Sequence, residues 1–358
     1  MRGHYKHWIH FTYARIYRGL LRAILRTIMR WQRLDDPQEG LTLAIACHAR
    51  LPEILEANFK MLRRQDLGNV RHILCAFDGP ISPRLERVAE RLRTKLPGVP
   101  MTFLYQSLPQ AWLLRVIRWG WVDCWLSYAK CIAATTTRYV MLHDMDAILL
   151  DPSFITRRFE SIRSRGDHFL GVRWYDFHSI TEDDKLIYIV DMVLDAAFLR
   201  NRFKPVHLFN HVYRINGKAL DLDTLIFPQL ATDRKSVIPA TEEDWVHPGQ
   251  VISQYVHLRC KGDGYVGSCD NNLFFIPYFL YLAGDTTVLA KHTRGLLESD
   301  TRFIPFLGYL MDIQRLTNVH QLWIRKQIEK LETAIEGEVR AEVEAYLAAI
   351  EGHITAAV

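Results

Sequence analysis

Two aspartates at the end of an apolar run are the residues of this chain best placed to do chemistry. Residues 139–142 are apolar and rich in strand formers, and His143, Asp144 and Asp146 follow them closely. If the run is a buried strand of an α/β sheet, the two carboxylates lie at its carboxyl end, where such sheets bind ligands. Mg²⁺ and Mn²⁺ prefer oxygen ligands of this kind. The pattern therefore predicts a divalent metal site, with a plain polar turn as the alternative.

The elements that would position these aspartates follow from the hydrophobic pattern. Strands are expected at residues 41–47, 70–77, 101–105 and 139–142, and helices at 53–64, 83–95 and 125–135. Strands that alternate with helices indicate a mostly parallel, right-handed, Rossmann-like α/β sheet. Polar or turn residues follow the strand ends at Cys47, Phe77 and Leu142, so these ends can converge on one ligand.

In its order and spacing this layout resembles the GT-A fold of nucleotide-sugar-dependent glycosyltransferases, most of all the family-2-like members. The resemblance covers residues 41–155, with a weaker similarity to residue 260. It implies a UDP- or GDP-linked sugar donor and a Mn²⁺ or Mg²⁺ ion bound by Asp144 and Asp146. The second strand ends in Phe-Asp-Gly-Pro at residues 77–80, where a double acid is common, and the Gln-x-x-Arg-Trp motif is absent. These departures argue against a processive polysaccharide synthase.

The resemblance also implies a set of donor-binding residues. The first strand and its turn would hold the base and ribose, the acid that closes the second strand would contact the nucleoside, and a lysine is frequent on the helix before the metal motif. The matching residues are Ala46, Cys47, His48, Arg50, Asp78, Lys130 and Asp144.

An inverting transfer needs a base for the acceptor hydroxyl, normally a carboxylate from the second half of the domain. Asp244, and after it Glu243, are the candidates, because both lie in an acidic segment beside Trp245, which could pack against a sugar ring. The segment is equally compatible with a solvated helix start, since Thr241 followed by acids makes a good N-cap.

Many enzymes of this fold add a late histidine to the metal shell, and two histidines are candidates. His257 ends the apolar stretch 251–258, which is expected to be a strand aimed at the site, and His247 lies in Val-His-Pro-Gly. Either could instead be a hydrogen-bonded structural residue. His143-Asp144 also matches the dipeptide of HD phosphohydrolases, but that family is all-helical, whereas this pair follows an apolar strand.

The first 34 residues contain eight Lys or Arg and no Asp or Glu, so the formal net charge of +5 comes from this segment. From Arg15 to Arg33 the arginines keep to one helical stripe, with apolar and aromatic residues opposite. This predicts a basic amphipathic helix within residues 1–37 that lies in an anionic membrane interface. A helix docked on the protein itself or on a partner is the main alternative. Nucleic acid is not expected as a partner, because no basic, aromatic-interleaved patch occurs elsewhere.

The length fits one catalytic domain at residues 38–300, with a donor half at 38–155 and an acceptor half at 156–300. In the acceptor half, strands are expected at 169–174 and 186–190, with residues 191–195 continuing the second strand, and Asp191 and Asp195 are possible acceptor contacts. Residues 301–358 read as a helical extension, broken near Gly337, for packing or homo-oligomerisation. The six cysteines show no zinc spacing and suit reduced thiols of a cytoplasmic protein.

These features predict a metal-dependent glycosyltransferase, peripheral on the cytoplasmic face of a membrane, with a saccharide or lipid-linked acceptor. One alternative is a catalytically inactive, membrane-tethered protein that binds nucleotide sugars or glycans. Another is a nucleotidyltransferase, which normally has a Gly-rich phosphate loop after its first strand. Residues 48–52 do not form such a loop.

Overall fold

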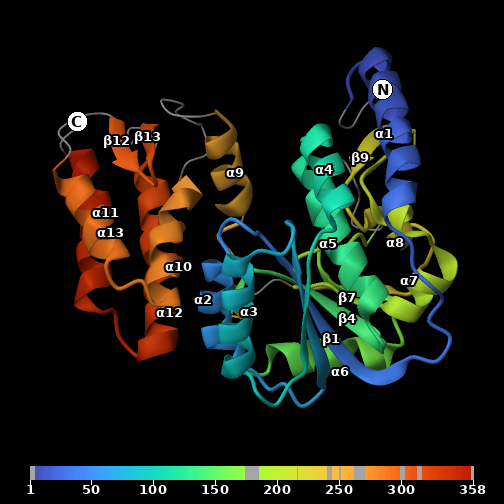
Figure 1. Ribbon diagram of the computed structural model, residues 1–358, viewed down its shortest axis with the longest axis horizontal. Coiled ribbons are helices and arrows are strands. Elements are labelled where there is room, and N and C mark those ends of the chain that lie inside the picture. The colour runs from blue at the N-terminus through green and yellow to red at the C-terminus, as the bar shows by residue number, and fades with distance from the viewer. Residues whose placement is uncertain are drawn as a thin grey trace. The chain divides into compact units, whose positions relative to one another are not determined.

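The computed structural model describes residues 5–173, 185–215, 217–239, 244–249, 251–261, 271–298, 303–312 and 317–355. The chain forms two compact units (Figure 1). The first comprises Met1–Arg50, Gln65–Met145 and Pro152–Thr241, and the second comprises Leu51–Arg64, Asp146–Asp151 and Glu242–Val358.

A seven-stranded sheet is the frame of the first unit, in the order β10-β6-β7-β4-β1-β2-β3. Its strands are β1 (Gln38–Cys47), β2 (Val70–Phe77), β3 (Met101–Leu104), β4 (Thr137–Asp144), β6 (Phe169–Val172), β7 (Val193–Asp195) and β10 (Lys235–Ile238). Strand β7 is antiparallel to both of its neighbours, and all the other pairs are parallel. The expected α/β class with a mostly parallel sheet is thereby confirmed.

The first unit also contains helices, several of which flank the sheet (Figure 1). They are α1 (Trp8–Ile28), α3 (Pro83–Lys95), α4 (Leu108–Ile117), α5 (Gly120–Ala134), α6 (Phe154–Arg165), α7 (Ala196–Arg202) and α8 (Ile226–Gln229), with the 3-10 turn η3 (Pro205–Leu208) and the hairpin β8 (His211–Ile215) and β9 (Lys218–Leu222). Helix α5 buries Trp125 and Tyr128 completely, so it is part of the main core. The side chains of Ser82 and Ser107 cap the starts of α3 and α4.

The second unit is mainly helical. It contains α2 (Glu53–Leu62), α9 (Val251–Lys261), η4 (Asn271–Phe274), α10 (Phe275–Ala283), α11 (Val288–Leu297), α12 (Asn318–Glu336) and α13 (Ala341–Thr355), with the strand pairs β5 (Ile148–Leu149) and β11 (Trp245–Val246), and β12 (Phe303–Phe306) and β13 (Tyr309–Asp312). Buried Tyr278 of α10 donates a hydrogen bond to Glu332 of α12 at 3.0 Å. Gly337, at φ 87°, ends α12 where the sequence predicts the break.

Two expected strands are absent from the described residues. The stretch 251–258 is part of helix α9, where Val251, Tyr255 and Leu258 are buried at helical spacing. The stretch 186–190 makes a single bridge, between Arg173 and Ile187, and strand β7 begins later. The strand prediction for 251–258 was wrong, and the prediction for 186–195 is confirmed only at its end, where Val193–Asp195 forms β7.

The expected N-terminal helix is present as α1, which packs on the first unit through buried Leu21 and Leu25. Within the described part of the chain, no helix is both long enough and apolar enough to cross a bilayer.

Candidate donor and metal site

The site begins at the edge of the first unit's sheet where β1, β2 and β4 end. Strand register places Ala46 of β1 beside Ala76 of β2 and beside Asp144 of β4. Because parallel strands end at one edge of a sheet, the turns that follow Cys47, Phe77 and Asp144 meet there. The predicted convergence of these three strand ends is confirmed.

Asp78 holds the turn after β1 in place. Its Oδ2 lies 2.5 Å from Nδ1 of His48, and its Oδ1 accepts a hydrogen bond from the backbone N–H of Ala49 at 2.6 Å. The backbone N–H of Asp78 donates to the carbonyl oxygen of Cys47 at 2.9 Å. A Cβ on Gly79 would lie 2.8 Å from the Cβ of Ala49, so the two turns can approach because this residue is glycine. Asp78 therefore positions the β1 turn, in addition to its expected contact with a nucleoside.

The turn after β1 is also bound to the residues at the end of β4. The backbone N–H of His48 donates to Sδ of Met145 at 3.0 Å. Asp144 accepts a hydrogen bond at Oδ1 from the hydroxyl of Tyr128 on α5. Burial raises the pKa of Tyr128, so this phenol remains a proton donor. Helix α5 thus orients the carboxylate of Asp144.

The other residues predicted to bind the nucleotide-sugar donor lie in different environments. Nζ of Lys130 donates to the carbonyl oxygen of Tyr105 at 2.5 Å, and burial lowers the pKa of this lysine. The Cys47 side chain is buried, and burial raises the pKa of its thiol, so it packs as an apolar group. Ala46 is half-buried and Arg50 is exposed. The contacts of these residues with a donor remain predictions.

Strands β5 and β11 bring Asp146 and His247 together within the second unit. The two strands pair antiparallel, with Val246 opposite Ile148. Asp146 lies two residues before Ile148, and His247 directly follows Val246, so both reach the same end of this ribbon. Nε2 of His247 lies 3.6 Å from Oδ1 of Asp146, and the two side chains are 14% and 8% exposed. The candidate His247 therefore lies beside the predicted metal ligand Asp146.

Asp144, two residues before Asp146 in the chain, completes a group of three residues that could hold a metal ion. The donor set is two carboxylates and one imidazole. Carboxylates suit Mn²⁺ and Mg²⁺ equally, whereas an imidazole favours Mn²⁺. The residues present therefore fit a divalent cation, and Mn²⁺ better than Mg²⁺.

The structure describes the predicted base Asp244, but not Glu243 or the side chain of His257. Asp244 lies directly before β11, and its carbonyl oxygen accepts a hydrogen bond from the backbone N–H of Leu150 at 2.8 Å. Glu243 and the side chain of His257 lie outside the described residues. The backbone of His257 belongs to α9, so this residue does not end a strand. The roles of all three remain predictions.

His143 belongs to the core of the first unit. Its Nδ1 lies 2.6 Å from Oδ1 of Asp191, and both side chains are buried. Asp195 is also buried, where it accepts a hydrogen bond from the backbone N–H of Phe198 at the start of α7. His143 lies within strand β4, unlike the helical residues of HD phosphohydrolases.

Two further carboxyls of the first unit, both half-buried, were not identified from the sequence. Asp123 on α5 accepts a hydrogen bond from Nε2 of Gln106 at 3.0 Å, and burial, followed by the charge of Asp78, raises its pKa to about 6. Burial likewise raises the pKa of Asp223, which follows β9, to about 6, and the charge of Asp144 contributes. Neither acid belongs to a recognisable motif, so only the tertiary packing distinguishes them from surface residues.

No family model and no curated protein sequence matches this chain. Solved structures do resemble it. Staphylococcus aureus TarS is 12% identical with a TM-score of 0.39, and the match covers 87% of this chain and 55% of that one. TarS 1–349 in complex with UDP-GlcNAc is 11% identical, with a TM-score of 0.38 and coverage of 88% and 92%.

A third solved structure is the mannosyltransferase PcManGT from Pyrobaculum calidifontis, in complex with GDP-Man and Mn²⁺. It is 11% identical, with a TM-score of 0.34 and coverage of 96% of each chain. This chain spans 55% of the length of the full TarS structure.

Proposed function

We propose that this protein is a metal-dependent glycosyltransferase of the GT-A type that transfers a sugar from a UDP- or GDP-linked donor to a saccharide or lipid-linked acceptor. The observation that carries the proposal is the group formed by Asp144, the last residue of β4, with Asp146 and His247. A buried parallel strand delivers the first of these ligands, and the β5–β11 register supports the other two.

In this proposal the three ligands hold Mn²⁺ or Mg²⁺, which when bound stabilises the negative charge of the departing nucleoside diphosphate. The turn formed by His48 and Ala49, fixed by Asp78, receives the nucleoside. Tyr128 keeps the carboxylate of Asp144 oriented by hydrogen bonding to it. Metal-binding side chains that are already oriented do not need to be reorganised during the reaction.

Asp244 is the proposed base that accepts the proton of the acceptor hydroxyl. Its backbone is fixed by the hydrogen bond from Leu150, and it lies three residues before His247 on the same ribbon. A carboxylate held in this way can take up a proton as the sugar–oxygen bond forms.

We further propose that the protein lies peripherally on the cytoplasmic face of an anionic membrane. Helix α1 exposes an apolar stripe formed by Ile9, Tyr13, Ile16, Leu20 and Ile24, each between 43% and 69% exposed. Helix α4 exposes a second stripe, formed by Leu108, Trp112 and Val116, each between 61% and 75% exposed. Exposed apolar surface of this extent is typical of membrane or partner binding.

The charges around the two stripes favour a lipid occupant. Arg15, Arg26, Arg115 and Arg118 are exposed on the same two helices or at their ends, and neither residues 1–34 nor residues 108–119 contain an acid. Basic residues beside an apolar helix face attract anionic lipid headgroups. Arg18 differs, because it pairs with Asp221 at 2.8 Å and so helps to attach α1 to the first unit.

The catalytic part of the proposal is tested by nucleotide release from a panel of UDP- and GDP-linked sugars, with Mn²⁺, Mg²⁺ or EDTA. We expect metal-dependent release from one donor and a loss of about 100-fold or more in Asp146→Ala. His247→Ala should remove the preference for Mn²⁺ over Mg²⁺, because the imidazole is its source. Asp36→Asn, at an exposed acid before β1, is the control.

If no donor is hydrolysed, calorimetric titration of the same donors decides between the remaining alternatives. Metal-dependent binding without turnover would indicate an enzyme that needs its acceptor, or a binding protein. The absence of any metal-dependent binding would disprove the assignment of Asp144 and Asp146.

A further inference from the structure

One glutamine links the end of strand β3 to the turn after β2 and to helix α5. The backbone N–H of Gln106 donates to the carbonyl oxygen of Gly79 at 2.9 Å, and Gly79 directly follows Asp78. The side chain of Gln106 is buried, and its Nε2 donates to Oδ1 of Asp123 at 3.0 Å. Asp123 lies in the first turn of α5. The start of α5 is therefore held to the turns that are proposed to receive the nucleoside.

Helix α5 turns one face toward the residues that follow β3. Asp123 and Lys130 are seven residues apart, or about two helical turns, so their side chains share a face. Nζ of Lys130 donates to the carbonyl oxygen of Tyr105, the first residue after β3. Tyr128 lies on a different face and donates to Asp144. Asp123 thus belongs to the β3 side of the site, and Tyr128 belongs to its metal side.

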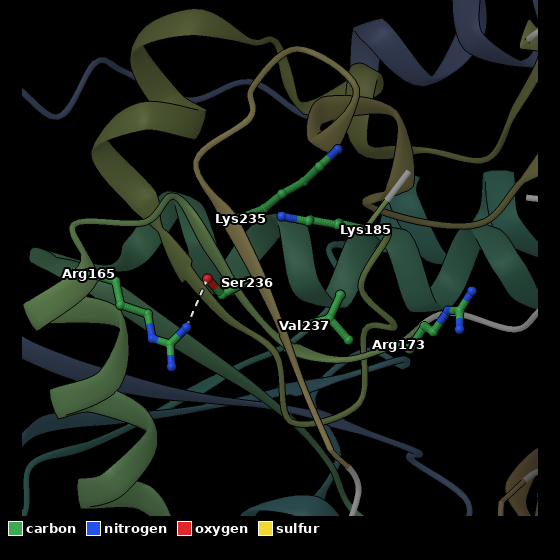
Figure 2. Close-up of a pocket in the computed structure, with 6 residues that line it drawn as sticks. All are labelled: Arg165, Arg173, Lys185, Lys235, Ser236 and Val237. Atoms are coloured by element: carbon green, nitrogen blue, oxygen red, sulfur yellow. Dashed lines mark hydrogen bonds between the residues drawn. The ribbon is translucent and has the colours of Figure 1, made fainter. Parts of the chain in front are cut away.

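The order of the strands separates these two sides. Strands β1 and β2 lie between β4 and β3, so the end of β3 is about 14 Å from the end of β4, at three strand spacings. An extended nucleoside diphosphate can cover this distance, with its diphosphate at Asp144 and its base near Gln106. The hollow in Figure 2, which is lined mostly by arginines and lysines, lies at β10, the opposite edge of the sheet. Its cations are therefore too distant to neutralise Asp123.

Asp123 keeps one carboxyl oxygen available to a ligand. The residue is half-buried, and within the described part of the chain its hydrogen bond is made by Oδ1. Its Oδ2 is not enclosed by the protein, so a ligand can reach it. Both oxygens of Asp78, in contrast, are engaged, Oδ2 with His48 and Oδ1 with Ala49. Of these two acids, Asp123 is therefore the one that offers an open acceptor to a base.

A carboxylate distinguishes nucleobases by the groups that they present to it. An ionised carboxylate only accepts hydrogen bonds, and guanine presents two adjacent donors, N1–H and the 2-amino group. Uracil presents one donor, N3–H, between two carbonyl oxygens, which a carboxylate repels. Burial, followed by the charge of Asp78, raises the pKa of Asp123 to about 6, so this carboxyl is ionised at pH 8. Its chemistry therefore favours guanine over uracil.

We propose that Asp123 recognises the nucleobase of the donor, and that the donor is a sugar linked to guanosine diphosphate. This inference rests on the glycosyltransferase function proposed above. Asp123 accepts hydrogen bonds from N1–H and the 2-amino group of guanine, while Gln106 holds the carboxylate in place. Hydrogen bonds to a charged acceptor are stronger than those between neutral groups, so this contact contributes to both affinity and specificity.

Calorimetric titration of the full chain at pH 8, with Mn²⁺ present, tests the inference with three nucleotides: GDP, UDP and inosine diphosphate. Inosine diphosphate lacks only the 2-amino group of GDP. We expect GDP to bind at least tenfold more tightly than either of the others, because each of them loses a charge-assisted hydrogen bond.

The variant Asp123→Asn places an amide donor where the wild type has an acceptor. It should lose the preference for GDP over inosine diphosphate. It should also bind xanthosine diphosphate more tightly than GDP, since xanthosine carries a carbonyl oxygen in place of the 2-amino group. A purely structural role of Asp123 would not change the order of these nucleotides. Asp36→Asn, at an exposed acid, is the matched control and should keep the order of the wild type.

The inference is overturned if UDP binds to the wild type as tightly as GDP does, a comparison that needs no variant. It is also overturned if Asp123→Asn, shown by thermal unfolding to be folded, keeps the preference for GDP over inosine diphosphate. Donor hydrolysis separates these results from a failure of the proposed function. Metal-dependent nucleotide release from a UDP-linked sugar overturns the guanosine assignment and leaves the transferase function intact. A GDP preference that depends on Asp123, without release from any donor, supports guanine recognition and counts against catalysis alone.

Discussion

Asp123 is a carboxyl that the fold keeps protonated to a higher pH than usual. Burial, followed by the nearby charge of Asp78, raises its pKa from 3.8 to about 6. Its one described hydrogen bond, from Gln106, acts in the opposite direction and is outweighed. Because the raised pKa belongs to the folded state, the folded protein binds this proton more tightly than the unfolded chain does.

The free energy of unfolding should therefore fall as the pH rises, because of Asp123. The stabilising contribution of protonated Asp123 is complete below about pH 4, where the carboxyl is protonated in both states, and it is lost as the pH rises through about 6. Asp123→Asn cannot ionise, so at pH 8 the variant should be more stable than the wild type by about 2 kcal/mol. Urea unfolding at pH 4 and pH 8 measures this difference.

Asp36→Asn, at an exposed acid, is the matched control and should show no such change. An equal effect of Asp123→Asn at both pH values would show that the carboxyl is not held protonated. If Asp123 also takes part in donor binding, the variant will gain stability and lose nucleotide affinity together, which is the usual conflict at functional sites.

Among the elements, the turns after β1 and β2 form a single structure that depends on one glycine. The Cβ of an alanine at position 79 would lie 2.8 Å from the Cβ of Ala49, a separation that forces the two turns apart. Gly79→Ala should therefore weaken nucleotide binding several-fold and destabilise the protein by about 1–3 kcal/mol, the usual cost of overpacking.

Gly98→Ala is the control for this variant, because a Cβ at Gly98 meets no atom within 4 Å. Nucleotide affinity from calorimetry and stability from urea unfolding are compared for the two variants. Equal behaviour of both would mean that the β1 and β2 turns can separate without cost, and that the proposed nucleoside site does not depend on their packing.

Only some of the helices and strands could be predicted from the sequence. Strands β1, β2 and β4 were predictable because each is a buried apolar run bounded by turn residues. The stretch 251–258 misled because Val251, Tyr255 and Leu258 fit helical spacing as well as an apolar run. The stretch 186–190 is buried too, but a side chain, that of Gln229, satisfies the backbone of Ile187 in place of a neighbouring strand.

The candidate site was predictable only in part. Asp144 and Asp146 could be identified because they follow an apolar run, whereas on sequence alone His257 ranked slightly ahead of His247. The β5–β11 register, which no local pattern reveals, places His247 beside Asp146. The role of Asp78 in fixing His48 also depends on two turns that lie far apart in the sequence.

For the whole molecule, the exposed apolar stripes of α1 and α4 are the features that bear on location. The two helices are linked by a hydrogen bond of 3.0 Å from Nε2 of Gln110 to the carbonyl oxygen of Ile28. Arg18 lies 4.0 Å from the ring centre of Trp119, which follows α4. Helix α1 is thus attached along one side by polar and apolar contacts, while its opposite side remains exposed.

Sedimentation with phosphatidylcholine vesicles, with and without phosphatidylserine, tests membrane binding. Leu20→Glu on α1 and Trp112→Glu on α4 should each weaken binding by roughly tenfold or more, because each removes a large apolar side chain from the interface. Ile81→Glu, at a residue that is 58% exposed elsewhere on the first unit, should have little effect. Arg15→Ala should weaken binding to the anionic vesicles alone, since one basic residue near the surface contributes about 1 kcal/mol there. Equal binding by all four variants, or none by the wild type, would leave docking on a protein partner as the explanation for these stripes.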